Sequence, residues 1–68
     1  MKIKVKNKNS FESSVFGGEL LIQYFPKLLT DGVEVEKSGD LYYLLDDEGK
    51  TYDTCFLSKE EMSKVISI

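Results

Sequence analysis

The sequence contains no histidine, no arginine and no tryptophan. Without histidine, no side chain has an ordinary pKa near neutrality, so general acid–base catalysis would need a carboxylate, lysine or cysteine with a shifted pKa. Without arginine, the chain lacks the side chain that grips carboxylate, phosphate or guanine through paired hydrogen bonds. These absences weaken most catalytic and anion-recognition chemistry. We therefore expect a protein that is not an enzyme and that holds no cofactor.

Cysteine occurs once, and long apolar runs are missing. Cys55 has no internal disulfide partner, and without histidine it has neither a catalytic base nor the further ligands of a zinc site. We interpret it as a small apolar residue of the core. No charged segment leads into an apolar stretch, and no apolar run approaches about 18 residues. We expect no signal peptide and no membrane partner, and the cytoplasm is the default compartment.

What is present suits one small globular domain, residues 1–68. Of its residues, 41% are hydrophobic, including four tyrosines and four phenylalanines. A domain of this size buries only about 60% of the surface that its unfolded chain exposes, so some hydrophobic side chains are left for the surface. The net charge is −3, but four lysines give the first ten residues +4, and five lysines against twelve acids give the other 58 residues −7. The body is acidic and its first strand is basic.

The segment Met1 to Lys8 alternates, with Ile3 and Val5 on one side and lysines on the other. Alternation with period two is typical of a half-buried β-strand. The lysines have two interpretations. We favour lysines that keep an outer strand from pairing with another chain, and the alternative is an anion-binding stripe.

The next residues carry turn signals and aromatic residues. Asn7 to Ser10 is typical of a turn. We expect the two aromatic residues of Phe11 to Phe16 to plug one end of a barrel or sandwich, and Gly17-Gly18 to interrupt the chain.

Glu19 to Leu29 (ELLIQYFPKLL) has two interpretations. Its apolar residues recur at spacings of one and four, which suits a helix with one apolar face. Pro26 opposes a helix, because a proline in a helix interior removes a hydrogen bond, costs about 3 kcal/mol and favours extended backbone at Phe25. We predict a strand over residues 19–25. The alternative is a kinked helix at about 19–29, packed on a three- to four-stranded antiparallel sheet.

The centre of the chain, Val33 to Leu57, has the pattern of three strands joined by two tight turns. Leu41 to Leu45 is apolar at every position, so we predict a central strand buried on both faces. Asp46 to Gly49 fits a hairpin turn with its glycine in the left-handed region, after which Lys50 to Leu57 returns as a strand. The core candidates are one side of the central strand, either Leu41, Tyr43 and Leu45 or Tyr42 and Leu44.

The end of the chain begins with a helix-start signal. Ser58-Lys59-Glu60-Glu61 matches a capping box, in which the serine and the last glutamate satisfy each other's backbone N–H groups. We predict a short helical turn near residues 58–62. The β-branched ending then favours a last strand over Val65–Ile68.

The segments LTDGVEVEK, SGDLYYLLDDEGKTY and VISI follow one another in the order strand, hairpin, acidic turn and final strand. In this order residues 28–68 resemble small SH3-like barrel proteins of Gram-positive bacteria and their phages. The chain departs from them in lacking an aromatic run in the first loop and in its long apolar segment LLIQYFP. The resemblance implies a small barrel that binds a partner, with no catalytic residues. We predict a mainly β fold, either an SH3-like barrel or a strongly twisted antiparallel sheet.

The hairpin turn Asp46-Asp47-Glu48, with Asp53, is the only dense carboxylate cluster. With Gly49 at the sixth position of a calcium loop, the first and twelfth ligands would be Leu44 and Cys55, which have no side-chain oxygen. We therefore predict a solvated hairpin turn with no metal.

The small size, the missing catalytic side chains and the surplus of hydrophobic residues predict a protein-binding module. Together with the resemblance, they suggest a phage or mobile-element accessory protein that docks on or inhibits a host protein. In one version, an acidic surface mimics nucleic-acid phosphates. Its residues are Glu34, Glu36, Asp46, Asp47, Glu48 and Asp53.

Two alternatives remain open. A single-stranded nucleic acid would need a basic groove beside exposed aromatic residues, but the acidic net charge and the absence of arginine oppose it. Its site would comprise Lys2, Lys4, Lys6 and Lys8 with Tyr42, Tyr43 and Tyr52. A homodimer could instead form through an edge strand, either Met1–Lys6 or Val65–Ile68.

Overall fold

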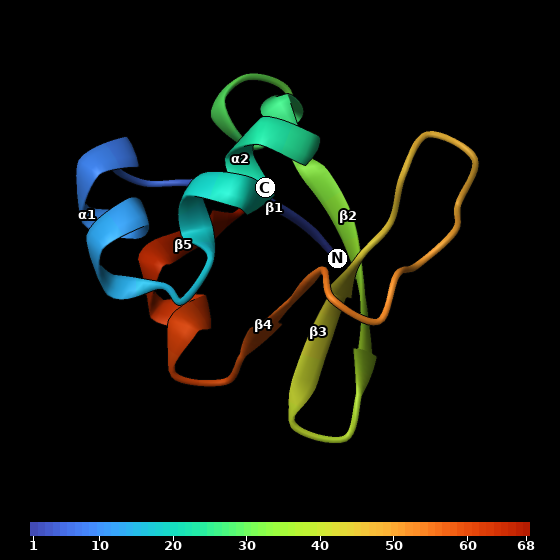
Figure 1. Ribbon diagram of the computed structural model, residues 1–68. Helices are drawn as coiled ribbons and strands as arrows, with labels where there is room; N and C mark the ends of the chain where they lie inside the picture. Colours follow the sequence, from blue (N-terminus) through green and yellow to red (C-terminus); the bar gives the residue numbers. More distant parts are fainter.

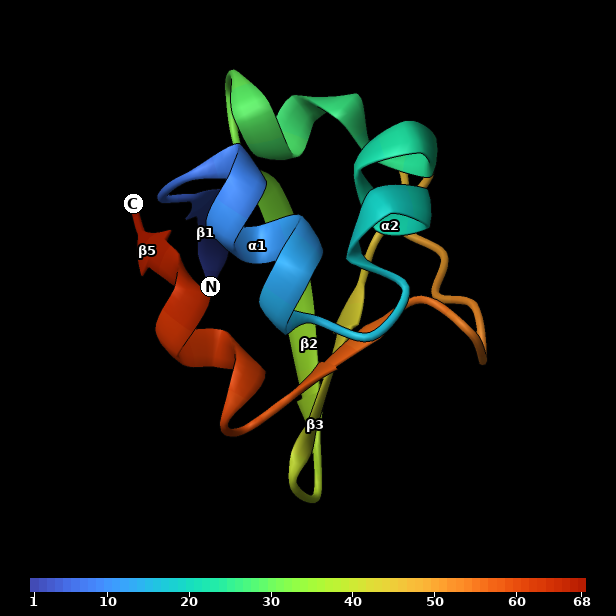
Figure 2. The same cartoon turned by 60° about the vertical axis from the view of Figure 1, so that its left-hand side comes forward.

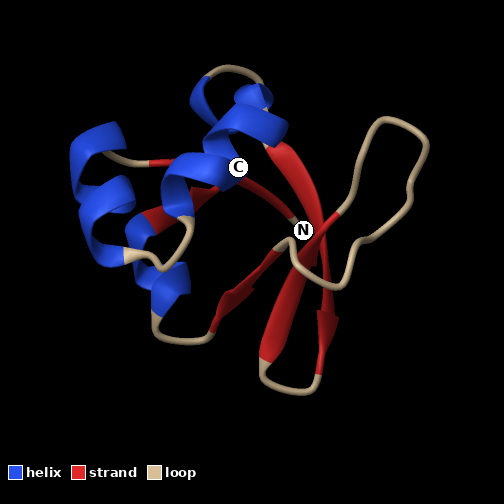
Figure 3. Cartoon of the chain, in the orientation of Figure 1, coloured by secondary structure: helices blue, strands red, loops and turns tan.

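The computed structural model describes residues 1–68 as one five-stranded antiparallel sheet with short helices. The strands are β1 (Lys2–Val5), β2 (Val33–Ser38), β3 (Leu41–Leu44), β4 (Phe56–Ser58) and β5 (Val65–Ser67). The helices are α1 (Lys8–Ser14) and α2 (Gly18–Tyr24), with 3₁₀ turns η1 (Pro26–Leu29) and η2 (Glu61–Lys64). The strand order is β4-β3-β2-β1-β5, and the sheet curls into a half-barrel (Figures 1 and 3). The mainly β prediction is confirmed, and the architecture is consistent with a small SH3-like barrel.

The core lies between the inner face of the sheet and the helical connection from β1 to β2. Alternating residues of the strands point inward, as the period-two pattern predicted. Figure 2 shows α1, α2 and η1 to one side of the sheet. The sheet contributes Ile3, Val5, Val33, Val35, Leu44, Leu57 and Val65, and the connection contributes Phe11, Val15, Leu21, Ile22, Phe25 and Leu28.

The predicted strand over residues 19–25 is wrong, because Gly18–Tyr24 forms α2. The helix ends before the proline. Phe25 leaves the helical region with φ −127° and ψ 67°, and Pro26 opens η1, where its missing N–H costs nothing. The alternative helix at about 19–29 therefore agrees with the structure in being helical, but it is divided into α2 and η1 at the proline. The break lets Phe25 and Leu28 both reach the core.

The helix α1 was not predicted. The side chain of Asn7 caps it by accepting a hydrogen bond from the backbone N–H of Ser10 at 2.9 Å. The two aromatic residues expected to plug a barrel end behave differently. Phe11 is fully buried, whereas Phe16 is 98% exposed, so the expectation is wrong for Phe16.

The strand β1 lies inside the sheet, between β2 and β5. Its lysines therefore do not protect an outer strand, and Met1–Lys6 is not an edge available for a homodimer. The protective role of the lysines and the homodimer through Met1–Lys6 both assumed that the first strand lies at the edge of the sheet. The edges are β4 and β5, so Val65–Ile68 keeps its predicted edge position.

The strand β3 is neither central nor buried on both faces. It lies next to the edge strand β4, and only Leu44 is fully buried. Tyr42 packs against the core on the same side as Leu44. The other side of the strand, with Leu41 and Tyr43, is half-buried because no second layer covers the outer face of this hairpin. The core alternative of Tyr42 and Leu44 is therefore correct.

The acidic hairpin turn forms, but the strand expected after it is mostly absent. The N–H of Gly49 donates to the carbonyl of Asp46 at 3.0 Å, and Gly49 has the predicted left-handed φ of 79°. Strand pairing then resumes only at Phe56. Residues 50–55 form a loop instead, so the predicted alternation of faces from Tyr52 onward does not apply, although Cys55 is buried as expected.

The capping box and the last strand are confirmed. The Ser58 hydroxyl accepts from the N–H of Glu61 at 3.2 Å, and the Glu61 carboxylate accepts from the N–H of Ser58 at 2.9 Å. The helical turn that follows is η2, slightly later than the predicted residues 58–62, and it leads directly into β5.

Candidate functional site

Three large side chains stand exposed at intervals of four residues along α2 and the loop before it. Phe16, Leu20 and Tyr24 are 98%, 53% and 66% exposed, and we call them the apolar stripe. A spacing of four places Leu20 and Tyr24 on one side of α2, and Phe16 lies in the loop that precedes the helix. The opposite side of α2 buries Leu21 and Ile22 in the core. All three stripe residues line one hollow of about 230 Å³, together with Leu21 and Cys55.

The fold holds this stripe in place from two directions. Gly17 turns the chain into α2 with φ 72°, a left-handed conformation that suits glycine. The N–H of Phe16 donates to the Glu61 carboxylate at 3.1 Å, which joins the loop to η2. A glycine turn and a long-range hydrogen bond therefore fix the backbone on both sides of the exposed Phe16 ring.

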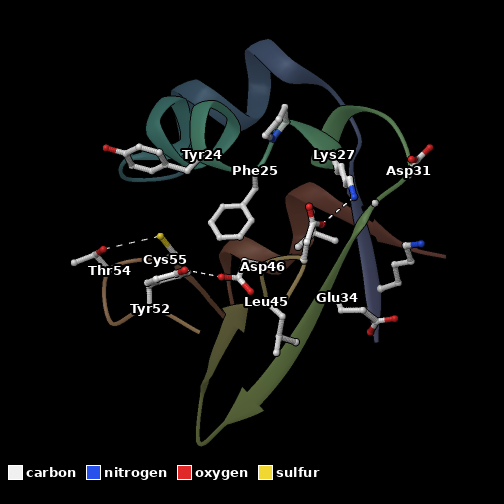
Figure 4. Close-up of a pocket in the computed structure, with 15 residues that line it drawn as sticks. Tyr24, Phe25, Lys27, Asp31, Glu34, Leu45, Asp46, Tyr52, Thr54 and Cys55 are labelled. Atoms are coloured by element: carbon white, nitrogen blue, oxygen red, sulfur yellow. Dashed lines mark hydrogen bonds and ion pairs between the residues drawn. The ribbon is translucent and has the colours of Figure 1, made fainter. Parts of the chain in front are cut away.

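A larger pocket of about 760 Å³ lies beside the stripe, between the α2–η1 junction, the start of β2 and the loop from β3 to β4 (Figure 4). Its apolar wall includes the nearly buried residues Phe25, Val33 and Cys55. The remaining lining residues are Lys2, Tyr24, Pro26, Lys27, Asp31, Gly32, Glu34, Leu45, Asp46, Asp47, Tyr52 and Thr54.

Asp46 organises the loop on one side of the pocket. One carboxylate oxygen accepts from the N–H groups of Glu48 and Lys50, each at 2.9 Å, and the other accepts from the Tyr52 hydroxyl. The hydrogen bond from Tyr52, with those from the backbone, lowers the pKa of Asp46 below its ordinary value. The same bond raises the pKa of Tyr52 above its ordinary value. Asp46 is thus held ionised and Tyr52 protonated.

An ion pair connects this loop to the η1 side of the pocket. The ammonium group of Lys27, at the start of η1, lies 2.9 Å from the carboxylate of Asp47 in the β3–β4 loop (Figure 4). The hydrogen bond and charge of Asp47, with a smaller contribution from Asp31, raise the pKa of Lys27. The lining residues carry four carboxylates, Asp31, Glu34, Asp46 and Asp47, against two lysines, Lys2 and Lys27.

The hollow and the pocket adjoin each other. Both are lined by Tyr24, Thr54 and Cys55. We call the two together the groove. One half is apolar and bordered by the stripe, and the other half is acidic.

The structure brings only some of the predicted acidic residues together. Glu34, Asp46 and Asp47 line the pocket, whereas Glu36, Glu48 and Asp53 do not. The residues that the sequence interpretation missed are those of the stripe. Their spacing of four was visible, but the strand predicted for residues 19–25 hid its meaning.

The tyrosines of the nucleic-acid alternative do not gather on one surface. Tyr42 packs inward against the core. Tyr43, on the opposite side of β3, has its ring 5.7 Å from the ring of Phe56. Tyr52 is in the β3–β4 loop, bonded to Asp46.

Of the lysines of that alternative, Lys2 and Lys4 share one face of β1, whereas Lys6 and Lys8 lie beyond the strand. Lys2 on β1 pairs with Glu34 on β2. Glu36, also on β2, pairs with Tyr43 on β3. Acidic residues of β2 therefore lie between the lysines of β1 and Tyr43. Lys6 donates to the carbonyl of Ser63. Lys4 lies opposite Ile66 on β5, and Lys8 begins α1.

No group of three or more histidine, cysteine, aspartate or glutamate side chains is arranged to hold a metal ion. None of the helices has the length and apolar character needed to cross a membrane. Comparison with protein-family models, with curated proteins and with solved structures finds no match for the chain.

Proposed function

We propose that this protein is a non-enzymatic protein-binding module that docks through the apolar stripe and the groove beside it. The observation that carries the proposal is the exposure of Phe16, Leu20 and Tyr24 side by side around one hollow. Contiguous exposed apolar surface is typical of interaction sites, and aromatic side chains supply much of the binding energy at protein interfaces.

The stripe leaves apolar surface in contact with water in the free protein, and a partner that covered it would gain the free energy of burial. Burying one large apolar side chain is worth about 1.5–3 kcal/mol, of which Phe16 contributes almost nothing to folding and Leu20 and Tyr24 contribute only part. The turn at Gly17 and the hydrogen bond to Glu61 hold Phe16 outward, so the surface is organised before a partner arrives. Organisation in advance reduces the entropy lost on binding.

The electrostatics of the groove support binding rather than catalysis. The pKa of Asp46 is shifted downward and the pKa of Tyr52 upward, and both shifts move the groups away from neutrality. A general acid or base works best with a pKa near the working pH. Lys27 is shifted away from neutrality as well.

A host protein as partner, and an origin in a phage or mobile element, remain proposals that rest on the SH3-like resemblance. Within protein binding, we favour docking through apolar contacts over phosphate mimicry. Asp46 already accepts three hydrogen bonds within the chain, and Asp47 is paired with Lys27. These two carboxylates are thus less free to replace phosphates on a basic surface.

The test is affinity capture with surface variants. Phe16→Ser combined with Leu20→Ser removes two of the three stripe side chains, and Ile66→Ser, at a 43% exposed residue on β5, is the matched control. We expect the wild type and the control to retain the same protein, including at about 1 M salt, where charge attraction is screened within about 3 Å. The double variant should retain at least about tenfold less.

Two outcomes would count against the proposal. Equal retention by the double variant would show that the stripe is not the docking surface. Recovery of nucleic acid without protein would favour the alternative class of partner, and loss of the protein at high salt would favour phosphate mimicry.

A further inference from the structure

We infer that the groove binds a partner segment that carries a lysine or arginine next to large apolar side chains, with the cation in the acidic pocket and the apolar side chains on the stripe. This inference rests on the proposed function and deepens it by stating the chemistry of the partner. It follows from the charges in the pocket, from its aromatic lining and from the continuity of its two halves.

The first argument is the surplus of negative charge. Four carboxylates line the pocket against two lysines, and one of these lysines, Lys27, is already paired with Asp47. Glu34 lies 3.3 Å from the terminal ammonium group of Met1. Asp31 and Asp46 have no ion-pair partner within the chain. Asp46 already accepts three hydrogen bonds, so Asp31 is the carboxylate that an incoming cation can complement most directly.

The second argument is the lining of aromatic rings. Tyr24, Phe25 and Tyr52 all line the pocket. The face of an aromatic ring attracts a lysine or arginine cation and accommodates the apolar stem of such a side chain. Carboxylates beside aromatic rings favour an organic cation, whereas a phosphate or an acidic peptide would meet the four carboxylates.

The third argument is continuity. Tyr24, Thr54 and Cys55 line both halves of the groove, so a ligand that fills the pocket reaches the stripe at Tyr24. A segment with only apolar side chains would leave the acidic half unpaired, and a segment with only basic side chains would leave the stripe exposed. The occupant that satisfies both halves carries the two kinds of side chain next to each other.

The experiment uses three small probes that differ only in their polar end, titrated into the uniformly ¹⁵N-labelled full chain. The probes are 4-phenylbutylamine, 4-phenylbutan-1-ol and 4-phenylbutyrate. We expect the amine to cause saturable amide shifts at Gly32, Asp46 and Cys55. It should bind at least about threefold more tightly than the alcohol, the magnitude of an exposed cation–π contact, and the carboxylate should bind most weakly.

Two charge variants test whether a carboxylate of the pocket causes the preference for the amine probe. Asp31→Asn removes one unpaired carboxylate of the pocket, and Asp40→Asn removes an exposed carboxylate in the turn between β2 and β3, outside the groove. We expect Asp31→Asn to reduce the preference for the amine over the alcohol at least about twofold, and Asp40→Asn to leave it unchanged. The amide spectrum of each variant checks that the fold is intact.

The inference is overturned if the carboxylate probe binds as tightly as the amine, if the amide shifts fall on the outer face near Tyr43 and Phe56, or if both variants behave alike. These outcomes are distinct from failure of the proposed function. If the probes show no preference for a cation but the stripe variant still loses its protein partner, the docking surface stands and only the partner chemistry is wrong. If the stripe variant keeps its partner, the proposed function itself fails.

Discussion

Glu61 and Phe16, 45 residues apart in the sequence, are joined by a hydrogen bond from the Phe16 N–H to the Glu61 carboxylate. The second oxygen of the same carboxylate accepts from the N–H of Ser58 and completes the capping box. The Glu61 side chain thus caps the turn after β4 and also holds the loop that carries Phe16, the most exposed aromatic residue. Local capping and the display of the apolar stripe depend on the same group.

Glu61→Ala should therefore affect stability and the stripe together. We expect a loss of about 1–2 kcal/mol in the free energy of unfolding, because two backbone N–H groups lose their acceptor. Urea denaturation measures this loss. Glu60→Ala, at an exposed neighbour in the same turn, should change it by less than about 0.5 kcal/mol. Equal effects of the two substitutions would show that the hydrogen bonds of Glu61 contribute nothing.

Phe11 in α1 and Phe16 in the loop after it should respond differently to truncation. Phe11→Ala opens a cavity in the core and should cost about 3–5 kcal/mol, enough to unfold much of a small domain. Phe16→Ala removes an exposed ring and should stay within about 0.5 kcal/mol of the wild type. Thermal or urea unfolding of both variants checks this contrast, and a large loss from Phe16→Ala would mean that its ring packs against the protein in solution.

Gly18→Ala should destabilise the protein although alanine is the better helix former. An added Cβ would lie 2.9 Å from the carbonyl oxygen of Phe11 and 3.2 Å from its ring. The helix preference of about 1 kcal/mol for alanine is then outweighed by displacement of a buried side chain or backbone. A rise in the unfolding midpoint would contradict this expectation.

Gly17→Ala is the companion measurement, because no atom lies within 4 Å of its added Cβ. We expect Gly17→Ala to lower the free energy of unfolding by about 1–2 kcal/mol, because alanine would have to adopt the left-handed backbone conformation. Steric and conformational costs are thus separated at adjacent positions.

The hydrogen bond between Tyr52 and Asp46 predicts a pH dependence at both ends of the scale. Because the folded pKa of Asp46 lies below its ordinary 3.8, its stabilising contribution is complete above that pH and is lost as the pH falls through the folded pKa. Because the folded pKa of Tyr52 lies above its ordinary 10.0, its contribution is complete below that pH and is lost as the pH rises through the folded pKa.

Tyr52→Phe removes the hydroxyl that is the largest cause of the lowered pKa of Asp46. In a carboxyl-carbon NMR titration, we expect the pKa of Asp46 to rise toward 3.8 in this variant. Tyr24→Phe, at an exposed tyrosine of the stripe, should leave the titration unchanged. An unchanged titration in Tyr52→Phe would assign the lowered pKa to the backbone donors alone.

The errors of the sequence interpretation have a common physical origin. Pro26 opposed a helix at residues 19–29, yet a helix that ends at Tyr24 avoids the conflict. The apolar run LYYLL suggested burial on both faces, yet one face of β3 stays half-exposed, because hydrophobicity does not state which faces will be covered. The stripe was missed for the same reason, since exposed and buried apolar residues look alike in a sequence.

The sequence by itself determined the features that depend on a few neighbouring residues. These are the alternation of β1 and β2, the left-handed turn at Gly49, and the capping box of Ser58 and Glu61. Each follows from backbone geometry and side-chain hydrogen bonds within about four positions, which no distant contact is needed to specify.

Only the tertiary structure decided the position of β1 inside the sheet, the burial of Phe11 against the exposure of Phe16, and the groove. The groove is assembled from the α2–η1 junction, the start of β2 and the loop after β3. The physical reason is that burial and surface shape depend on which elements cover one another, and this is settled by contacts between segments far apart in the chain.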